Sequence, residues 1–195
     1  MTPKQIEKIQ NKIAKIKRAL AADKRQWGCY DDSRGLRYLP PALYLKLQDY
    51  RGAMRYFNWF DKNFPDDAGY PIFLFEWLIT LFKNGKHKEA EKMALKTFFA
   101  DTYLLDNFLG KETLNLQITE HSNLENSALV ENLNYEQNDE VLQDFTKWLS
   151  EFVLSEKFYL YAHEFLEIER RLKTEPVGIT RSQLVSRRYS LLDNY

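Results

Sequence analysis

The sequence predicts an all-α fold, and three observations carry this prediction. Apolar residues recur at steps of three and four along most segments, which is the spacing of one helix face. Capping residues and prolines precede several of these segments, and clusters of Gly, Asn and Asp separate them. A chain of 195 residues with 44% hydrophobic content can also bury one sizeable core. We therefore expect one helical domain over residues 1–175, followed by a flexible tail over 176–195.

An amphipathic N-terminal helix is expected over residues 1–25. Thr2 can cap it, Pro3 suits the first helical position, and Gln5 completes a capping box. Its apolar residues form a narrow seam, which consists of Ile6, Ile9, Ile13, Ile16 and Leu20. Because the seam spans only about two heptads, we favour a helix packed by one stripe onto its own domain. A seam between two copies of the chain is the alternative.

A loop rich in turn-forming residues follows over residues 26–39. Two interpretations of its charged residues are open. Asp31 and Asp32 could be a metal or general-base pair, with Arg34 and Arg37 as anion binders. Alternatively, the aspartates cap a helix and pair with the arginines. We favour the second interpretation, because the spacing matches no known carboxylate or phosphate motif.

Residues 37–110 are expected to form helical hairpins, and the first hairpin covers about 37–65. The regular part of its first helix begins at or just before Pro40, because proline is tolerated in the first turn of a helix but not in its interior. The partner helix runs over residues 49–63. Pro65 and a turn close it.

The second hairpin is expected over about 70–99. Its helices run over residues 70–82 and 87–99, and residues 83–86 supply the turn between them. The first of these helices is apolar nearly all round, so it must be buried on all sides. A further short helix, over residues 101–110, ends at a glycine that is well placed as a C-terminal cap.

Beyond residue 110 the helical pattern weakens and then returns. Residues 111–138 are acidic and rich in Asn, and we expect an irregular connector with one short helix. Residues 139–175 regain strong helical periodicity and predict a pair of helices. The aromatic residues on their apolar faces are Phe145, Trp148, Phe152, Phe158 and Phe165.

The first hairpin carries a family resemblance. Ala53, Phe57, Phe60 and Pro65 follow one another at steps of four, three and five, and this stretch resembles the second half of a tetratricopeptide repeat. Residues 85–90 resemble the same turn and the entry to the second helix of a repeat. The two hairpins together cover about a third of the chain.

The second hairpin departs from the family pattern. Ala90 follows Ala53 by 37 positions, whereas the standard period is about 34 residues. Ala94 replaces the aromatic residue of the second helix. Pro41 and Leu78 stand where the family has a small residue in the first helix of each hairpin. The first hairpin is thus a good match and the second a degenerate one.

The resemblance implies a short right-handed α-solenoid of stacked antiparallel hairpins, which binds peptides or partner domains on the surface of its first helices. The candidate groove or partner-binding residues, counted from Ala53 and Ala90, are Tyr38, Leu45, Ile72, Phe75, Ile79 and Phe82. None of them is a cation or an Asn, so the carboxylate clamp of some family members is not expected. An apolar groove of this size must be covered, by the C-terminal helices, a second copy or a peptide.

The charges balance over the whole chain, with 28 basic and 28 acidic residues, so nucleic acid is not an expected partner. Locally they are polarised. Residues 1–26 contain eight cations and two anions, a net charge of +6, whereas residues 111–144 contain one cation and eight anions, a net charge of −7. We favour a solvated helix face for the basic segment. A nucleic-acid-associated regulator that uses this helix is the alternative function.

No catalytic residue, metal site or cofactor is expected. His87, His121 and His163 share no ligand spacing with one another or with Cys29. As the single cysteine, Cys29 cannot form an internal disulfide and reads as a small buried hydrophobe, which fits a cytoplasmic protein. No signal peptide or membrane span is expected. The leading prediction is a non-catalytic protein-protein interaction or scaffold module, and an enzyme or ligand-binding protein built on residues 31–37 is the second alternative.

Overall fold

In the computed structural model, the described residues are 1–30, 35–113, 116, 130, 132–193 and 195, and every regular element within them is helical. The predicted all-α fold is therefore confirmed. The α-helices in chain order are α1 (Pro3–Trp27), α2 (Pro40–Lys46), α3 (Tyr50–Asn63), α4 (Pro71–Lys83), α5 (His87–Ala100), α6 (Leu104–Phe108), α8 (Gln143–Val153), α9 (Glu156–Thr174) and α10 (Ile179–Ser190). Two short 3-10 helices, η1 (Leu36–Tyr38) and η2 (Glu140–Leu142), precede α2 and α8.

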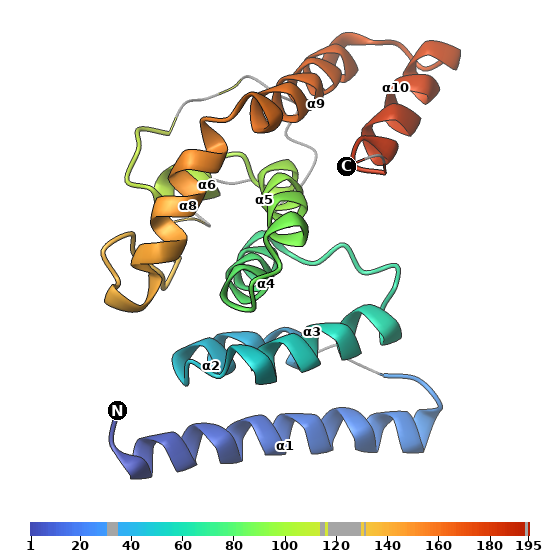
Figure 1. Cartoon of the computed structure of the whole chain (residues 1–195). Helices are drawn as coiled ribbons and strands as arrows, with labels where there is room; N and C mark the ends of the chain where they lie inside the picture. The colour runs from blue at the N-terminus through green and yellow to red at the C-terminus, as the bar shows by residue number, and fades with distance from the viewer. Residues whose placement is uncertain (31–34, 114–115, 117–129, 131, 194) are drawn as a thin grey trace.

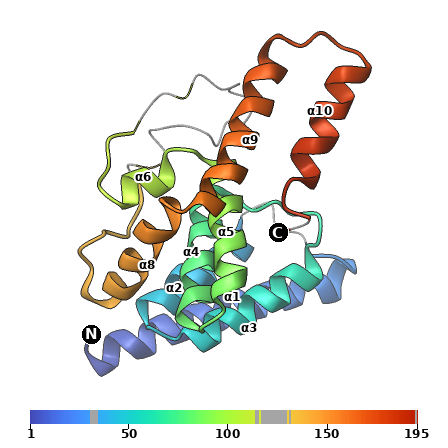
Figure 2. The same ribbon diagram turned by 45° about the horizontal axis from the view of Figure 1, so that its top comes forward.

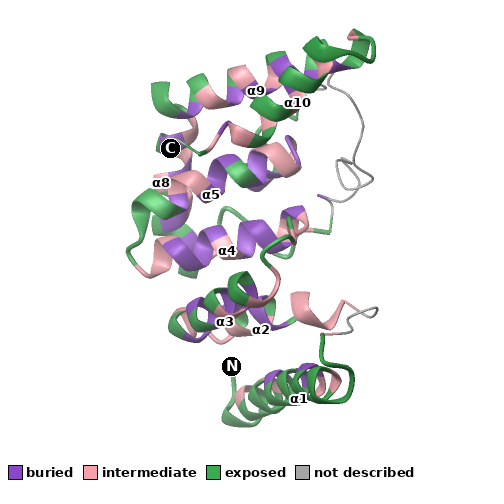
Figure 3. Ribbon diagram, turned by 90° about the vertical axis from the view of Figure 1, so that its right-hand side faces the viewer, coloured by how far each residue is buried: buried purple, intermediate pink, exposed green. Residues whose placement is uncertain are grey.

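The helices are stacked in layers (Figure 1). α1 lies along one side of the molecule, the pair α2 and α3 packs over it, and the pair α4 and α5 forms the next layer. α9 and α10 lie farthest from α1, while α6 and α8 lie together on one side of the central pair. The central position of α4 explains its burial: Figure 3 shows this helix mostly buried and α1 mostly exposed.

α1 begins and packs as the sequence predicts. Thr2 Oγ1 accepts a hydrogen bond from the Gln5 backbone N–H (3.3 Å), and Gln5 Oε1 accepts one from the Thr2 N–H (2.8 Å). The buried residues of the seam, on the side of α2 and η1, are Ile13, Ile16 and Leu20. Ile6 and Ile9 are only half-buried. The stripe thus packs onto the first hairpin of its own chain, as we favoured.

The boundaries of both hairpins match the prediction to within one or two residues. Asp49 caps α3, because its Oδ1 accepts a hydrogen bond from the Gly52 N–H (2.8 Å). α2 and α3 pack tightly at Gly52, where an added Cβ would lie 2.7 Å from Tyr44 Cε1. Ala53 and Ala90 are both fully buried. Small residues at the start of α3 and α5 therefore let each hairpin close.

The C-terminal helix pair packs on both helices of the second hairpin. α8 covers α4, with the Phe145 ring 5.8 Å from that of Phe75 and 5.5 Å from that of Phe82 between centroids. α9 covers α5 instead, where Phe165 stacks on Phe99 at 4.3 Å with an interplanar angle of 14°. The aromatic residues of the two helices remain connected, because the Phe152 ring of α8 lies 5.5 Å from the Phe158 ring of α9.

Residues 176–195 are not the flexible tail that the sequence predicted, since most of them form α10. α10 returns beside α9 to make a third hairpin (Figure 2). Leu184 and Leu191 are buried, and an ion pair joins Arg187 Nε to Glu164 Oε1 at 2.6 Å. Only a few apolar residues of α10 pack on the rest of the domain. The apolar periodicity of this segment was therefore too weak to predict a packed helix.

The acidic connector expected over residues 111–138, with its short helix, lies mostly outside the described residues. Before it, Gly110 adopts the left-handed conformation (φ 64°) expected of a C-terminal cap just after α6. Near its end, Tyr135 returns to the core and donates a hydrogen bond from its hydroxyl to Glu76 Oε1 on α4 (2.9 Å).

Candidate functional site

Five of the six predicted groove residues belong to the main hydrophobic core. Two of them, Leu45 and Ile79, also line an open pocket of about 520 Å³ beside residues 134–142. Leu45, Phe75 and Ile79 are buried, and Ile72 and Phe82 are half-buried. α8 lies on this side of α4 and packs Phe145 and Trp148 against Phe75 and Phe82. Burying each such side chain contributes about 1.5 to 3 kcal/mol. The chain itself therefore covers the α4 part of the surface expected to receive a partner, at Phe75 and Phe82.

The sixth residue, Tyr38, lies in a separate aromatic cluster around α3 and the start of α4. Its hydroxyl donates to the carboxylate of Asp67 (2.7 Å to Oδ2), and Arg37 Nε forms an ion pair with the same oxygen at 2.8 Å. The Asp67 Oδ1 also accepts a hydrogen bond from the Gly69 N–H (2.9 Å). Burial, with the Asp67 hydrogen bond second, raises the pKa of Tyr38. Arg37 is thus engaged in holding the turn between α3 and α4.

Three members of the predicted polar loop, Asp31, Asp32 and Arg34, lie outside the described residues. Beside them Cys29 is exposed, so the interpretation of this residue as a buried hydrophobe was wrong. Gly28 ends α1 at the preceding position, and Cys29 therefore leaves the helix before any apolar layer covers it. Among the described residues, no group of three or more His, Cys, Asp or Glu side chains could hold a metal ion.

An open cleft of about 850 Å³ lies between α3, α4 and α5 on one side and α10 on the other. We call it the α5–α10 cleft. Its large apolar lining residues are Met54, Pro71, Leu74, Trp77, Leu81, Met93, Phe99, Phe165 and Leu192. Its ionisable lining residues are Lys86, Glu89, Lys92, Lys96, Arg188, Tyr189 and Asp193. This combination of an apolar floor and a charged rim is typical of a binding site.

The floor of the cleft is held by aromatic stacking. The Trp77 ring stacks on Phe57 at 4.7 Å with an interplanar angle of 13°, and Phe99 stacks on Phe165 from α9. Such pairs add about 0.5 to 1.5 kcal/mol beyond the area that they bury. Met54 and Met93 also line the cleft, and their unbranched thioethers adapt to irregular partners. The floor is therefore preformed, with two adaptable positions.

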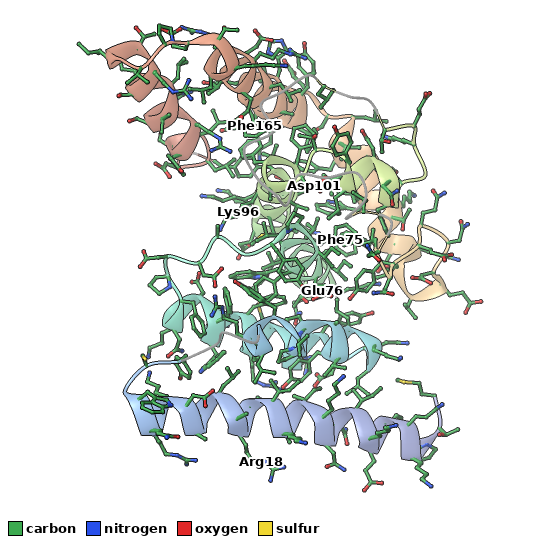
Figure 4. The ribbon with its side chains drawn as sticks, turned by 180° about the vertical axis from the view of Figure 1, so that it is seen from behind. Arg18, Phe75, Glu76, Lys96, Asp101 and Phe165 are labelled. Carbon is green, nitrogen blue, oxygen red and sulfur yellow. The ribbon has the colours of Figure 1, made fainter. Side chains whose placement is uncertain are left out.

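The rim of the cleft is mainly positive. Lys92 and Lys96 lie one turn apart on α5, and neither forms an ion pair with any residue that the structure describes. Figure 4 labels Lys96, which belongs to α5 and lines the cleft. Lys86, by contrast, pairs with Glu89 at 3.1 Å. Two ammonium groups without an ion-pair partner among the described residues therefore lie at the edge of an apolar floor.

Arg188 fixes the α10 wall of the cleft. Its Nε forms an ion pair with Glu169 on α9, a residue with only 3% of its side chain exposed. Its guanidinium carbon lies 5.8 Å from the centre of the Phe165 ring. Breaking a buried pair of this kind leaves an uncompensated charge and costs several kcal/mol. α10 is thus held in place beside α5, and the cleft keeps its shape.

The sequence did not predict this cleft, for two reasons. One wall comes from α10, which was expected to be a flexible tail. The floor comes from the side of α4 that carries Leu74, Trp77 and Leu81, and a helix that is apolar all round gives no sign of which face stays open. The available signal was the pair of lysines at positions 92 and 96, four residues apart on one helix face.

A buried carboxyl group lies behind the floor, on α4. Glu76 is 3% exposed, and burial raises its pKa to about 8. The hydrogen bond from the Tyr135 hydroxyl and the nearby Ala42 backbone N–H lower the pKa but do not offset the burial. Ala42 offers the first free N–H of α2, because Pro40 and Pro41 have none. Glu76 therefore connects α4, α2 and the end of the connector, and it is mainly protonated at neutral pH.

Comparisons with protein-family models, with curated proteins and with solved structures found no match. Among the described residues, no helix combines the length and the apolar character that crossing a bilayer requires.

Proposed function

We propose that this protein is a non-catalytic interaction module that binds an apolar, acidic segment of a partner protein in the α5–α10 cleft. The observation that carries the proposal is the preformed apolar floor beside the unpaired ammonium groups of Lys92 and Lys96. Apolar side chains of the partner would bury against Trp77 and Phe99, and its carboxylates would face the lysines.

The lining favours binding over catalysis. Its described residues include no histidine, cysteine or serine, so no Ser–His or Cys–His pair for nucleophilic catalysis lines this part of the structure. The second alternative from the sequence, an enzyme or ligand-binding protein built on residues 31–37, loses one of its proposed anion binders, because Arg37 already pairs with Asp67. The cleft is the better candidate for the site.

The two hairpins support a tetratricopeptide-like architecture as part of this proposal. α2 with α3 and α4 with α5 form successive antiparallel pairs, with fully buried alanines at positions 53 and 90. The binding surface differs from the one that the resemblance implied, because α8 packs on Phe75 and Phe82 of α4. We also propose a cytoplasmic location, since an exposed lone thiol at Cys29 is best kept reduced.

The proposal can be tested with random 16-residue peptides displayed on phage and selected on the full-length protein. We expect the enriched peptides to combine Leu, Phe or Trp with several Glu or Asp residues. For a synthetic copy of an enriched peptide, the double variant Lys92→Glu/Lys96→Glu should weaken binding at least tenfold, because attraction becomes repulsion at both positions. The matched control Lys88→Glu/Lys147→Glu reverses two exposed charges that do not line the cleft.

Two results would contradict the proposed function. One is enrichment of basic or purely polar peptides, or of none at all. The other is an equal loss of affinity in the cleft variant and in its control, which would show that only the overall charge matters.

A further inference from the structure

The outer face of α1 is a continuous row of cations. At about 100° per residue, six basic side chains share an arc of about 140° on the side away from the buried stripe. These are Lys4, Lys8, Lys12, Lys15, Arg18 and Arg25, and all six are exposed. Glu7 is the one acidic residue within that arc. The helix therefore faces its own domain with isoleucines and faces solvent with positive charge.

The row is long and straight. From Lys4 to Arg25 it extends about 32 Å at 1.5 Å per residue, close to the roughly 34 Å of one turn of duplex DNA. Figure 1 shows α1 as a single straight helix at the edge of the molecule, and Figure 4 shows Arg18 pointing away from the layers that pack on it. Nothing else in the described structure covers this face.

The charges of this row are not compensated within the described structure, where none of the six cations forms an ion pair. Arg18 Nε donates to the Ala14 carbonyl of its own helix at 3.4 Å, which leaves the guanidinium charge unpaired. The zero net charge of the chain thus hides a strongly positive surface, because the tertiary structure gathers like charges on one side.

We propose that the outer face of α1 binds the phosphate backbone of double-stranded nucleic acid, independently of base sequence. A straight row of cations matches a straight polyanion, and such contacts release counterions whatever the sequence. A membrane surface fits less well. The apolar stripe of α1 is buried against α2, and the outer arc carries no large apolar side chain that could enter a bilayer. This surface is separate from the α5–α10 cleft and does not depend on it.

The test uses the full-length protein and a fluorescein-labelled 30-base-pair DNA duplex of mixed sequence, with anisotropy measured from 25 to 200 mM KCl. Contact with three to five phosphates predicts a slope of about −3 to −4.5 for log K against log salt concentration. The triple variant Lys8→Gln/Lys15→Gln/Arg18→Gln should bind at least tenfold more weakly at 50 mM KCl, with a slope shallower by about 2 to 3.

A matched control removes the same charge elsewhere. The variant Lys88→Gln/Lys111→Gln/Lys147→Gln changes three exposed lysines outside α1 and should keep the affinity within about threefold. Circular dichroism melting of both triples should match that of the wild type, since all the changed side chains are exposed.

Three outcomes would overturn the proposal. The first is no duplex binding at 25 mM KCl. The second is an equal loss in both triple variants. The third is tighter binding to vesicles of phosphatidylserine and phosphatidylcholine, or to polyglutamate, than to the duplex at the same salt concentration. Peptide binding in the α5–α10 cleft should be unchanged in the α1 triple variant, so failure of one proposal leaves the other intact.

Discussion

The buried carboxyl group of Glu76 makes the stability of this protein depend on pH in a direction that can be calculated. Its pKa is about 8 in the folded protein, against an ordinary value of 4.5. Between these values the folded state binds the proton and the unfolded state does not. The free energy of unfolding therefore falls as the pH rises through this window. The stabilising effect is complete below about pH 4.5 and lost above about pH 8.

The size of the effect follows from the width of the window. Each pKa unit corresponds to about 1.36 kcal/mol, so a window of 3.5 units from 4.5 to 8 amounts to about 5 kcal/mol. We expect the pH-dependent change in the free energy of unfolding to be about 3 to 5 kcal/mol. Residual structure in the denatured chain and relaxation of the native state both reduce the difference between the unfolded and folded pKa values of Glu76. Total stability is about 5 to 15 kcal/mol for most domains. This one carboxyl group can therefore decide whether the fold survives above pH 8.

The assay compares the wild type with Glu76→Gln by urea unfolding, at half-unit steps from pH 5.5 to pH 9 and with a reductant for Cys29. Gln keeps an acceptor for the Tyr135 hydroxyl and stays neutral at every pH. The stability of the variant relative to the wild type should rise by about 1.4 kcal/mol per pH unit until pH 8. The exposed control Glu151→Gln should differ from the wild type by no more than about 0.5 kcal/mol throughout.

A constant difference between Glu76→Gln and the wild type from pH 5.5 to pH 9 would refute this reasoning. It would mean that water or a cation reaches the carboxylate. The packing of Tyr135 over α4, which excludes both in the structure, would then be wrong.

Three further perturbations test the packing of the hairpins, the cover over α4 and the cleft. Ala53→Leu should cost about 1 to 3 kcal/mol by overpacking the first hairpin, whereas Ala21→Leu, on the exposed side of α1, should not; equal melting temperatures would contradict the close approach of α2 and α3. Phe145→Ala should cost about 3 to 5 kcal/mol by urea unfolding, against about 0.5 kcal/mol for Val141→Ala, which is exposed; similar losses would mean that α8 does not cover α4. Ending the chain at residue 176 removes α10 and should abolish peptide binding in the α5–α10 cleft, measured by anisotropy, while unfolding stays cooperative; unchanged peptide binding would remove α10 from the site.

The sequence alone determined where most helices begin and end. The signals at these boundaries act through atoms only a few residues away. They are the capping box of Thr2 and Gln5, the restriction of Pro40 to a first turn, and the cap at Asp49. Local rules of this kind hold in any tertiary setting. The burial of α4 was also readable, because a helix that is apolar all round has no face to show to water.

The tertiary structure alone decided which surfaces stay open. The sequence shows that Phe75 and Trp77 are both apolar, but only the packing of α8 covers the first and leaves the second lining the α5–α10 cleft. α10 docks through pairs such as Arg187 with Glu164, which lie 23 residues apart and leave no periodic signal. The environment of Glu76 depends on three segments that meet in space, so its raised pKa has no signature in the sequence. Helix propensity and capping are short-range effects, whereas burial and charge segregation depend on contacts between distant segments.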